Sequence, residues 1–347
     1  MLEVTKSAPQ MAIIQLGQAF ENFFAHRTRF PVFRRKGVDD RFTLTNDLVC
    51  IEGERIRIPK LGWVRMREAL RFTGRIVSAT ISCVAGNWYV GITVDIPDAT
   101  SLPSAENQGA VGVDLGVNTL ATLSNGEVFT GPKALCTQLN KLRRLDRSLS
   151  RKVKGSRNRA KAKLKLARLH ARIANLRRES LHQLTTSITR RFHTIGIENL
   201  NVKGMLSNRR LARSLADMSF HELRRQLEYK AVWRGGCIVV ADRWYPSSKQ
   251  CSCCGYRLEA LDLGVRRWRC PGCSALHDRD INAAINLKKL AVSSTVSACG
   301  GDGAGPTRKR GVKLAPVKQE SNSRTLVAGM ASFCVSLEER TGGDMMT

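Results

Sequence analysis

Two closely spaced pairs of cysteines constrain this chain more than any other feature of its sequence. Cys251 and Cys254 form the first pair, and after a gap of fifteen residues Cys270 and Cys273 form the second. Pairs with this spacing can place four thiolates around one ion, at about 2.3 Å, in the tetrahedral geometry of a structural zinc site. Disulfides or four unrelated buried thiols are the alternatives, but disulfides need a secretory context that the sequence does not indicate. We therefore expect zinc, with Cys253 as a spare thiol.

An acidic motif follows the second cysteine pair directly. The run HDRD at 277–280 leads into INAAINLKKL, where Asp280 precedes the small residues Ala283 and Ala284. This pattern predicts a helix that begins near Asp280 and lies close against a sheet. An aspartate that only caps a helix is the commoner explanation of such a residue. Behind a zinc site, however, the direction of the carboxylate would be fixed, so the position favours a functional acid with partners elsewhere in the chain.

The net charge indicates what kind of molecule this protein binds. Lys and Arg number 57 against 29 acids, which gives a formal charge of +28. Such an excess favours a polyanionic partner, and we expect nucleic acid. A membrane surface is the main competing polyanion, but no apolar run approaches the roughly 18 residues needed to span a bilayer. The sequence MLEVTKSAPQMAIIQL at the start does not resemble a signal peptide. The chain is therefore expected in the cytoplasm with reduced cysteines.

The first hundred residues are predicted to contain a helix and a small β-structure. The segment 9–27 carries apolar residues at near-helical spacing, and a basic and aromatic loop around Pro31 follows it. Short alternating runs from 37 to 100 predict an antiparallel β-barrel, with a hairpin turn at Ala85-Gly86-Asn87. One face of these strands could contact a nucleic-acid backbone, or could be charged only for solubility. The basic residues on it are Arg55, Arg57, Lys60 and Arg65.

Two acids stand at the ends of apolar runs that predict buried strands. The run Val111 to Val113 ends in Asp114, and the run Thr194 to Ile197 ends in Glu198. Gly116 lies near Asp114 and would let a ligand approach closely. An acid in this place is a usual way to present a metal-binding carboxylate. A carboxylate that caps the next turn is the plainer explanation of Glu198 when that residue is taken alone.

Residues 134–192 are predicted to be helical and are strongly basic. Between Lys141 and Arg178 there are sixteen Lys or Arg residues and one acid, Asp146. Gly155 and Ser156 break the segment, so we expect two long antiparallel helices. Because solvated helices ordinarily carry mixed charge, the uniform sign favours contact with nucleic acid. The residues expected to make this contact are Lys141, Arg143, Arg144, Arg147, Arg151, Lys152, Lys161, Lys163, Lys165, Arg168 and Arg172.

The order of the predicted elements is characteristic of one fold class. The strand with Asp114 precedes two further strands, the basic helices, the strand with Glu198, a helix, a strand, the cysteine pairs and the helix with Asp280. This is the connectivity of an RNase H-like fold, so we expect a multidomain α+β chain. Its predicted parts are a helical segment at 1–36, the barrel at 37–100, an RNase H-like core at 109–246, an inserted zinc ribbon at 247–276, and a final core helix at 277–290.

Three carboxylates that converge in such a core would suit phosphodiester hydrolysis. They could hold two Mg²⁺ ions roughly 3.5 to 4 Å apart, one to activate water and one to stabilise the leaving oxygen. Hard oxygen ligands are what these ions prefer, which explains why Asp and Glu rather than His would carry the site.

Four segments together resemble the TnpB/OrfB family of insertion-sequence transposons, which are relatives of the type V CRISPR effector nucleases. They are GVDLGVNTLAT, IGIENLNVKGM, the zinc ribbon and DRDINAAINL, and the match covers about residues 9–290. The resemblance implies a RuvC-like nuclease, guided by an RNA from the transposon end, that cuts DNA beside a short adjacent motif. Base pairing would supply sequence specificity, while the protein grips the backbone and reads only the adjacent motif.

The resemblance also implies roles for individual residues. Asp114, Glu198 and Asp280 would be the catalytic acids that bind Mg²⁺ or Mn²⁺, with Asp278 as the reserve candidate for the third acid. The paired cysteines would bind structural zinc. The expected partners are the guide RNA and double- and single-stranded target DNA, without a membrane or a small-molecule substrate. The expected location is the bacterial or archaeal cytoplasm, at the nucleoid.

The two ends of the chain carry further expectations. Family members usually begin with an additional strand and helices ahead of Ala8, so the resemblance predicts a chain shortened at its N-terminus. Residues 1–36 would then be the remnant of a recognition segment, and 37–100 a wedge-like barrel. Residues 291–347 are rich in Gly and of mixed charge, and are predicted to be disordered.

Two other functions remain open. A transposase that moves DNA itself would need a different nucleophile, such as a Tyr paired with a His-x-His metal site, and no such pair exists among the six histidines. A nuclease-inactive or decayed RNA-guided DNA-binding protein, acting as a repressor, would keep the basic helices and could lose its acids. All three acids are present here. The sequence therefore favours a metal-dependent DNA endonuclease.

Overall fold

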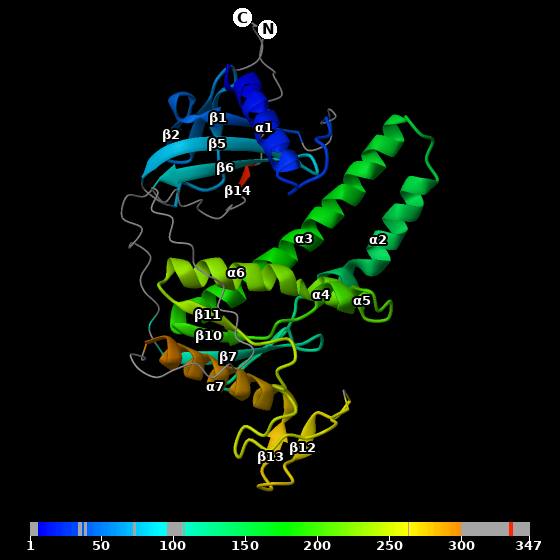
Figure 1. Ribbon diagram of the computed structural model, residues 1–347. Helices are drawn as coiled ribbons and strands as arrows, with labels where there is room; N and C mark the ends of the chain where they lie inside the picture. Colours follow the sequence, from blue (N-terminus) through cyan, green and yellow to red (C-terminus); the bar gives the residue numbers. More distant parts are fainter. Residues whose placement is uncertain are drawn as a thin grey trace, which may run out of the picture. The chain divides into compact units, whose positions relative to one another are not determined.

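The computed structural model describes residues 6–33, 37, 40–71, 74–95, 106, 108–262, 264–299 and 333–335. The chain divides into two compact units, each with its own core. The first contains residues 1–99, 155–171 and 320–347, and the second contains 100–154 and 172–319. Figure 1 shows the elements of both units.

The first unit is an antiparallel β-structure with one helix. One sheet has the strand order β1-β5-β6-β14 and the other has the order β2-β3-β4. The elements are α1 (Ser7–Phe24), β1 (Arg41–Thr45), the 3-10 helix η1 (Asn46–Leu48), β2 (Cys50–Glu52), β3 (Arg55–Ile58), β4 (Gly62–Arg65), β5 (Arg75–Val84), β6 (Asn87–Asp95) and β14 (Phe333–Val335). The predicted antiparallel strands of 37–100 are thus confirmed as two sheets.

A single apolar cluster joins the two sheets. Leu44, Ile56 and Ile81 are almost fully buried in it, while the arginines of β3 point outward. This alternation is what a strand with one buried face requires. Between β5 and β6, Ala85 and Gly86 have φ of 53° and 78°, which is the backbone of a two-residue hairpin turn. The predicted hairpin is confirmed, and Asn87 is the first residue of β6.

The predicted amphipathic helix near the N-terminus is confirmed as α1, and it contacts β1. The hydroxyl of Ser7 lies 3.1 Å from that of Thr45, within hydrogen-bonding distance. Much of the apolar surface of α1 is nevertheless exposed, including Ile13 and Phe24. The ring of Phe24 packs on that of Phe20. Among the described residues, none of the helices combines the length and apolar character that a membrane crossing requires.

The second unit is built on a mixed five-stranded sheet of order β11-β10-β7-β8-β9. Strands β7, β10 and β11 are parallel to one another, whereas β7, β8 and β9 form an antiparallel meander. The strands are β7 (Ala110–Leu115), β8 (Ala121–Leu123), β9 (Val128–Phe129), β10 (Thr194–Ile197) and β11 (Cys237–Val240). Numbered from β7 along the chain, this order reads five, four, one, two, three.

Helices cover both faces of this sheet (Figure 1). The second half of α3 and α6 pack on one face, where Val113, Ile197, Leu184 and Leu223 belong to one buried cluster. Helix α7 packs on the other face, against β7 and β10. The helices are α2 (Ala134–Ser150), α3 (Arg157–Arg191), α4 (Val202–Leu206), α5 (Ala212–Met218), α6 (Phe220–Trp233) and α7 (Arg279–Cys299).

The basic helices predicted at 134–192 are α2 and α3, and the predicted break at Gly155 and Ser156 lies between them. A buried carboxylate holds the start of α2. Asp217 of α5 accepts hydrogen bonds from the backbone N–H groups of Leu135 and Cys136, and pairs with Arg177 of α3 at 2.7 Å. Asp217 therefore supplies from another helix the cap that the sequence of α2 lacks.

Helix α7 is longer than the sequence predicted. The helix expected to end at residue 290 continues to Cys299, so the prediction of disorder from residue 291 is wrong for that stretch. The reason is tertiary packing, because Ala291 is fully buried against the sheet near Gly196. Strand β14 also pairs with β6. The rest of 300–347, like most of the linker at 96–107, lies outside the described residues.

Candidate active site

A pair of glycines determines how closely α7 approaches the sheet. Gly112 of β7 and Gly196 of β10 are register partners, so they lie side by side. A Cβ on Gly112 would lie 1.8 Å from the backbone O of Ala284, and one on Gly196 would lie 2.4 Å from that of Leu287. No residue with a side chain fits at either place without moving α7. The small residues Ala283 and Ala284, predicted to allow close packing, are buried in this contact.

The same contact places the three predicted acids in one region. Side chains two residues apart on a strand share a face, so Asp114 and Glu198 project from the face on which α7 lies. Asp280 lies one helical turn before Ala284 on α7. Asp114 and Glu198 are within hydrogen-bonding reach of each other, and Asp280 acts electrostatically on both. The three carboxylates are not close enough together for one oxygen of each to lie within 4.8 Å of the other two.

Burial and mutual repulsion disfavour the ionised form of the first two acids. Burial raises the pKa of Asp114 well above its usual value, and the charges of Glu198 and Asp280 raise it further. Burial also raises the pKa of Glu198, although a hydrogen bond from Ser247 opposes the shift. The positive charge of Arg279 lowers the pKa of both. Carboxylates placed in this way share protons or cations, because like charges so close together cannot all remain ionised unaided.

Asp278 and Asp280 have different partners. The Oδ1 of Asp278 accepts hydrogen bonds from the backbone N–H groups of Asp280 and Ile281, at 3.1 and 3.2 Å. Asp278 therefore caps α7, which is the structural role considered above for an aspartate in this motif. The carboxylate of Asp280 instead forms a 3.3 Å ion pair with Arg266.

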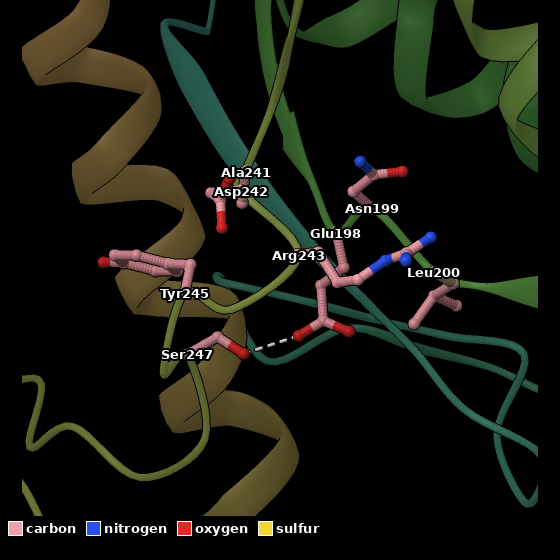
Figure 2. A pocket seen from close by; sticks show the side chains of 8 residues that line it. All are labelled: Glu198, Asn199, Leu200, Ala241, Asp242, Arg243, Tyr245 and Ser247. Atoms are coloured by element: carbon pink, nitrogen blue, oxygen red, sulfur yellow. Dashed lines mark hydrogen bonds between the residues drawn. The ribbon is translucent and has the colours of Figure 1, made fainter. Parts of the chain in front are cut away.

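A small pocket adjoins Glu198 at the carboxyl end of β11. Figure 2 shows its lining, in which the Glu198 carboxylate points toward Ser247 and its Oε1 accepts a 2.5 Å hydrogen bond from the Ser247 hydroxyl. Asn199, Asp242, Arg243 and Tyr245 also line the pocket. The pocket beside Glu198 is therefore largely polar, and Arg243 belongs to its lining.

The four paired cysteines meet in one cluster. Their sulfur atoms all lie within 4.8 Å of one another, with 3.7 Å between Cys251 and Cys273 and 3.6 Å between Cys254 and Cys270. Four sulfurs at about 2.3 Å from a central zinc ion would be roughly 3.8 Å apart, so the cluster fits that metal. A disulfide needs about 2.05 Å, and each of the four paired cysteines is free. The alternative of disulfides is wrong for this site.

Cys253 was predicted to be a spare thiol, but it belongs to a second arrangement. Cys253, Cys251 and His277 also have ligand atoms within 4.8 Å of one another. His277 is buried, with its Nε2 3.0 Å from the Cys251 sulfur and its ring beside Trp268. These contacts connect the cluster to β13 (Leu276–Asp278), which pairs with β12 (Arg267–Arg269) and leads into α7.

The predicted nucleic-acid contacts of α2 and α3 are largely solvent-facing. All of the eleven named Lys and Arg residues except Lys152 are exposed. Arg168 has an internal partner as well, because its Nε donates to the backbone O of Ala85 at 3.4 Å. On α3, Leu169 and Ile173 are buried, whereas Leu176 is exposed.

Several site residues were not predicted from the sequence. Gly112 and Gly196 each stand two residues before an acid, and this repeated Gly-x-acid pattern could have indicated the close approach of α7. Ser247 carried no such signal, because nothing local in the sequence predicts that it reaches Glu198.

Two segments of the chain match known protein families. Residues 91–209 match the OrfB_IS605 family, described as "Probable transposase", and residues 220–287 match the "Cas12f1-like, TNB domain". A Streptomyces pristinaespiralis protein named "Putative RNA-guided DNA endonuclease" is 39% identical over 93% of this chain and 80% of its own length. The chain belongs to the TnpB/OrfB family. The two matched segments of this TnpB/OrfB protein contain Asp114, Glu198, the paired cysteines and Asp280.

A second relative supports the same membership. "Putative RNA-guided DNA endonuclease InsQ" of Escherichia coli K12 is 37% identical to this TnpB/OrfB protein, over 84% of this chain and 75% of its own length. Among solved structures, a "CRISPR-Cas12f Ternary Complex" covers 82% of this chain and 70% of its own, with 12% identity and a TM-score of 0.40. That likeness is too distant to carry an argument about the site.

Proposed function

We propose that this protein is an RNA-guided DNA endonuclease in which Asp114, Glu198 and Asp280 hold divalent metal ions for phosphodiester hydrolysis. Family membership supports the activity, since the relatives named above are described as RNA-guided DNA endonucleases. The observation that carries the assignment of residues is the glycine contact of α7. It brings an acid from each of two strands and an acid from a distant helix to the same face of one sheet.

The sheet topology supports an RNase H-like, RuvC-type core. That fold has a three-stranded meander followed by two strands parallel to its first, and the order β11-β10-β7-β8-β9 has this form. The zinc ribbon enters between β11 and α7, where the sequence predicted an insertion. In this class of open sheet, sites form at the carboxyl ends of the parallel strands, which is where Asp114 and Glu198 stand.

The residues fit Mg²⁺ or Mn²⁺ better than a softer metal. All the donors are carboxylate oxygens, and two of them repel each other unless a proton or cation lies between them. When bound, such ions activate water and stabilise the leaving oxygen of a phosphodiester. Asp114 and Glu198 would orient the site from the rigid sheet, Asp280 would close it from α7, and Arg279 would help to keep the acids ionised.

The exposed basic residues of α2 and those of α3 are the proposed contacts for the backbone of the guide RNA and its target DNA. This proposal rests on the number and uniform sign of the exposed charges rather than on any shaped pocket. The four-cysteine cluster is proposed to hold structural zinc and to fix the start of α7.

Alanine substitution of each acid tests the proposal. Asp114→Ala, Glu198→Ala and Asp280→Ala should each lower metal-dependent cleavage of target DNA by about a thousandfold or more, because each removes several kcal/mol of charge stabilisation. Binding of the guide RNA should remain near the wild-type value. A nuclease-inactive, DNA-binding role is the second candidate, and it would be favoured if the guide-bound wild-type protein binds target DNA without cutting it.

A further inference from the structure

Two buried asparagines of α7 form hydrogen bonds with the segment that leads into the cysteine cluster. Asn282 and Asn286 are 1% and 2% exposed and lie one helical turn apart on the same face. The side-chain N–H groups of both donate to the backbone O of Gln250, each at 2.7 Å. The amide of Asn286 also donates to the backbone O of Ser247 at 2.8 Å, and the side-chain O of Asn282 accepts from the N–H of Ser252 at 2.9 Å.

This arrangement is specific because a buried amide is unfavourable without partners. A buried polar side chain without hydrogen bonds loses about 1 to 3 kcal/mol, and asparagine is a poor residue inside a helix. Both amides are paired here, and all of the partners just named are backbone groups of residues 247–252. The segment from 247 to 252 is therefore fixed to α7 as well as to the four-cysteine cluster at Cys251.

Ser247 connects these hydrogen bonds to Glu198. Its backbone O is held by Asn286, while its hydroxyl donates to Oε1 of Glu198 and its side chain is almost fully buried. A hydroxyl that donates to one carboxylate oxygen fixes the rotation of that carboxylate. The other oxygen of Glu198 is then left for the side where Asp114 and a metal ion would lie.

We propose that Ser247, held by Asn282 and Asn286, is a positioning residue that sets the orientation of the Glu198 carboxylate relative to Asp280. Asp280 lies two residues before Asn282 on α7, so one helix carries an acid and also fixes the serine that orients another. The zinc ribbon enters the same segment at Cys251. The inference rests on the proposed function and deepens it, since it concerns the same three carboxylates.

The matched pair Ser247→Ala and Ser248→Ala tests this role in the guide-bound, zinc-loaded protein. Removal of an outer-shell partner typically weakens metal binding or activity 10- to 100-fold. We expect Ser247→Ala to lower the cleavage rate about 10-fold or more and to raise the Mg²⁺ concentration for half-maximal rate, while Ser248→Ala behaves as wild type. The zinc content should be the same in all three proteins. Ser247→Thr keeps a hydroxyl and should restore the Mg²⁺ dependence.

A second readout does not depend on cleavage. Mn²⁺ binding to the guide-bound protein is followed by the electron paramagnetic resonance of the free ion, with Asp114→Ala as the reference for ions bound to RNA. Ser247→Ala should bind the site-specific Mn²⁺ about 10-fold more weakly than wild type, in line with the outer-shell effect. If Ser247→Ala binds Mn²⁺ and cleaves DNA as wild type does, the positioning role is wrong. If the wild-type protein itself does not cleave, the proposed function fails instead.

A double-variant measurement separates positioning from general destabilisation. Asn286→Asp removes both donated hydrogen bonds at nearly constant size and should reproduce the altered Mg²⁺ dependence. Residues that act through one path give non-additive effects. The combination with Ser247→Ala should therefore lower the rate no further than the stronger single change. Multiplied losses would show two independent effects and overturn the proposal. If Ser247→Ala does not fold, Asn286→Asp alone tests the proposal. A wild-type Mg²⁺ dependence in Asn286→Asp would then refute the positioning role of Ser247.

Discussion

The carboxylate site and the basic side chains of α2 and α3 would all meet nucleic acid, but the site and the helices are built differently. At the carboxylate site every acid has partners, and its approach to the others is set by backbone contacts at Gly112 and Gly196. On the basic helices ten of the eleven Lys and Arg side chains named above are exposed. Chemistry needs fixed distances, whereas attraction to a polyanion needs only sign and density of charge.

Loss of zinc from the four-cysteine cluster should have the largest effect on cleavage, because the cluster supports the start of α7. Cys270→Ser should lose zinc and with it cleavage, since structural zinc contributes about 10 to 16 kcal/mol of folding free energy in zinc-finger peptides. Atomic spectroscopy and a cleavage assay measure both outcomes. Cys253→Ser is the control and should keep its zinc. Release of zinc by Cys253→Ser but not by Cys270→Ser would place the ion in the alternative group with His277.

A methyl group at Gly112 tests the fixed geometry directly. In Gly112→Ala the new Cβ would meet the backbone of Ala284, so α7 must move away from the sheet. A displacement of about 1 Å can lower a reaction rate about 100-fold, and we expect a loss of at least that size with retained guide binding. Gly91→Ala is the matched control, because the nearest atom to its Cβ is 3.9 Å away. Equal cleavage by the two variants would contradict the role of this contact.

Charge reversal on α3 tests the other side of the comparison and should have a graded effect. Replacement of Lys161, Lys163 and Lys165 by Glu should weaken guide-RNA binding and flatten its salt dependence. The slope of log K against log salt should fall by about 0.7 for each lost phosphate contact. Fluorescence anisotropy at several salt concentrations measures it.

An equal charge change elsewhere is the control for this experiment. The same reversal at exposed arginines of the zinc ribbon should leave the slope for guide RNA nearly unchanged. They are Arg257, Arg267 and Arg269. If both triple variants lose affinity equally, net charge rather than the surface of α3 governs binding.

Lys230 is a buried cation, in contrast to the exposed basic residues of α2 and α3. It should have a small effect on the pH dependence of folding stability. Its Nζ donates to the backbone O of His182 and the hydroxyls of Thr185 and Thr186, and burial lowers its pKa from 10.5 to about 8. Between these values the unfolded chain binds more protons, so Lys230 makes folding stability rise with pH from about 8 to 10.5. Denaturant unfolding of Lys230→Met should lack this increment, whereas the exposed Lys203→Met should keep it. An unchanged pH dependence in Lys230→Met would contradict the assignment.

The sequence predicted what depends on spacing and short-range pattern. The cysteine pairs, the acids at strand ends and the break at Gly155 are all local signals, and the structure places them as expected. The length of α7 was mispredicted because it depends on burial of Ala291 against a strand far away in the sequence. The contacts of Ser247, Asn282 and Asn286 join segments that lie far apart in the sequence, and no periodic pattern of residues predicts them.

The most direct measurement is the position of bound Mn²⁺, located by anomalous X-ray scattering in crystals of the guide-bound protein. We predict peaks among the carboxylates of Asp114, Glu198 and Asp280, and none there in Asp114→Ala crystals. Mn²⁺ bound elsewhere in the wild-type protein, with these three carboxylates unliganded, would contradict the existence of a shared metal site.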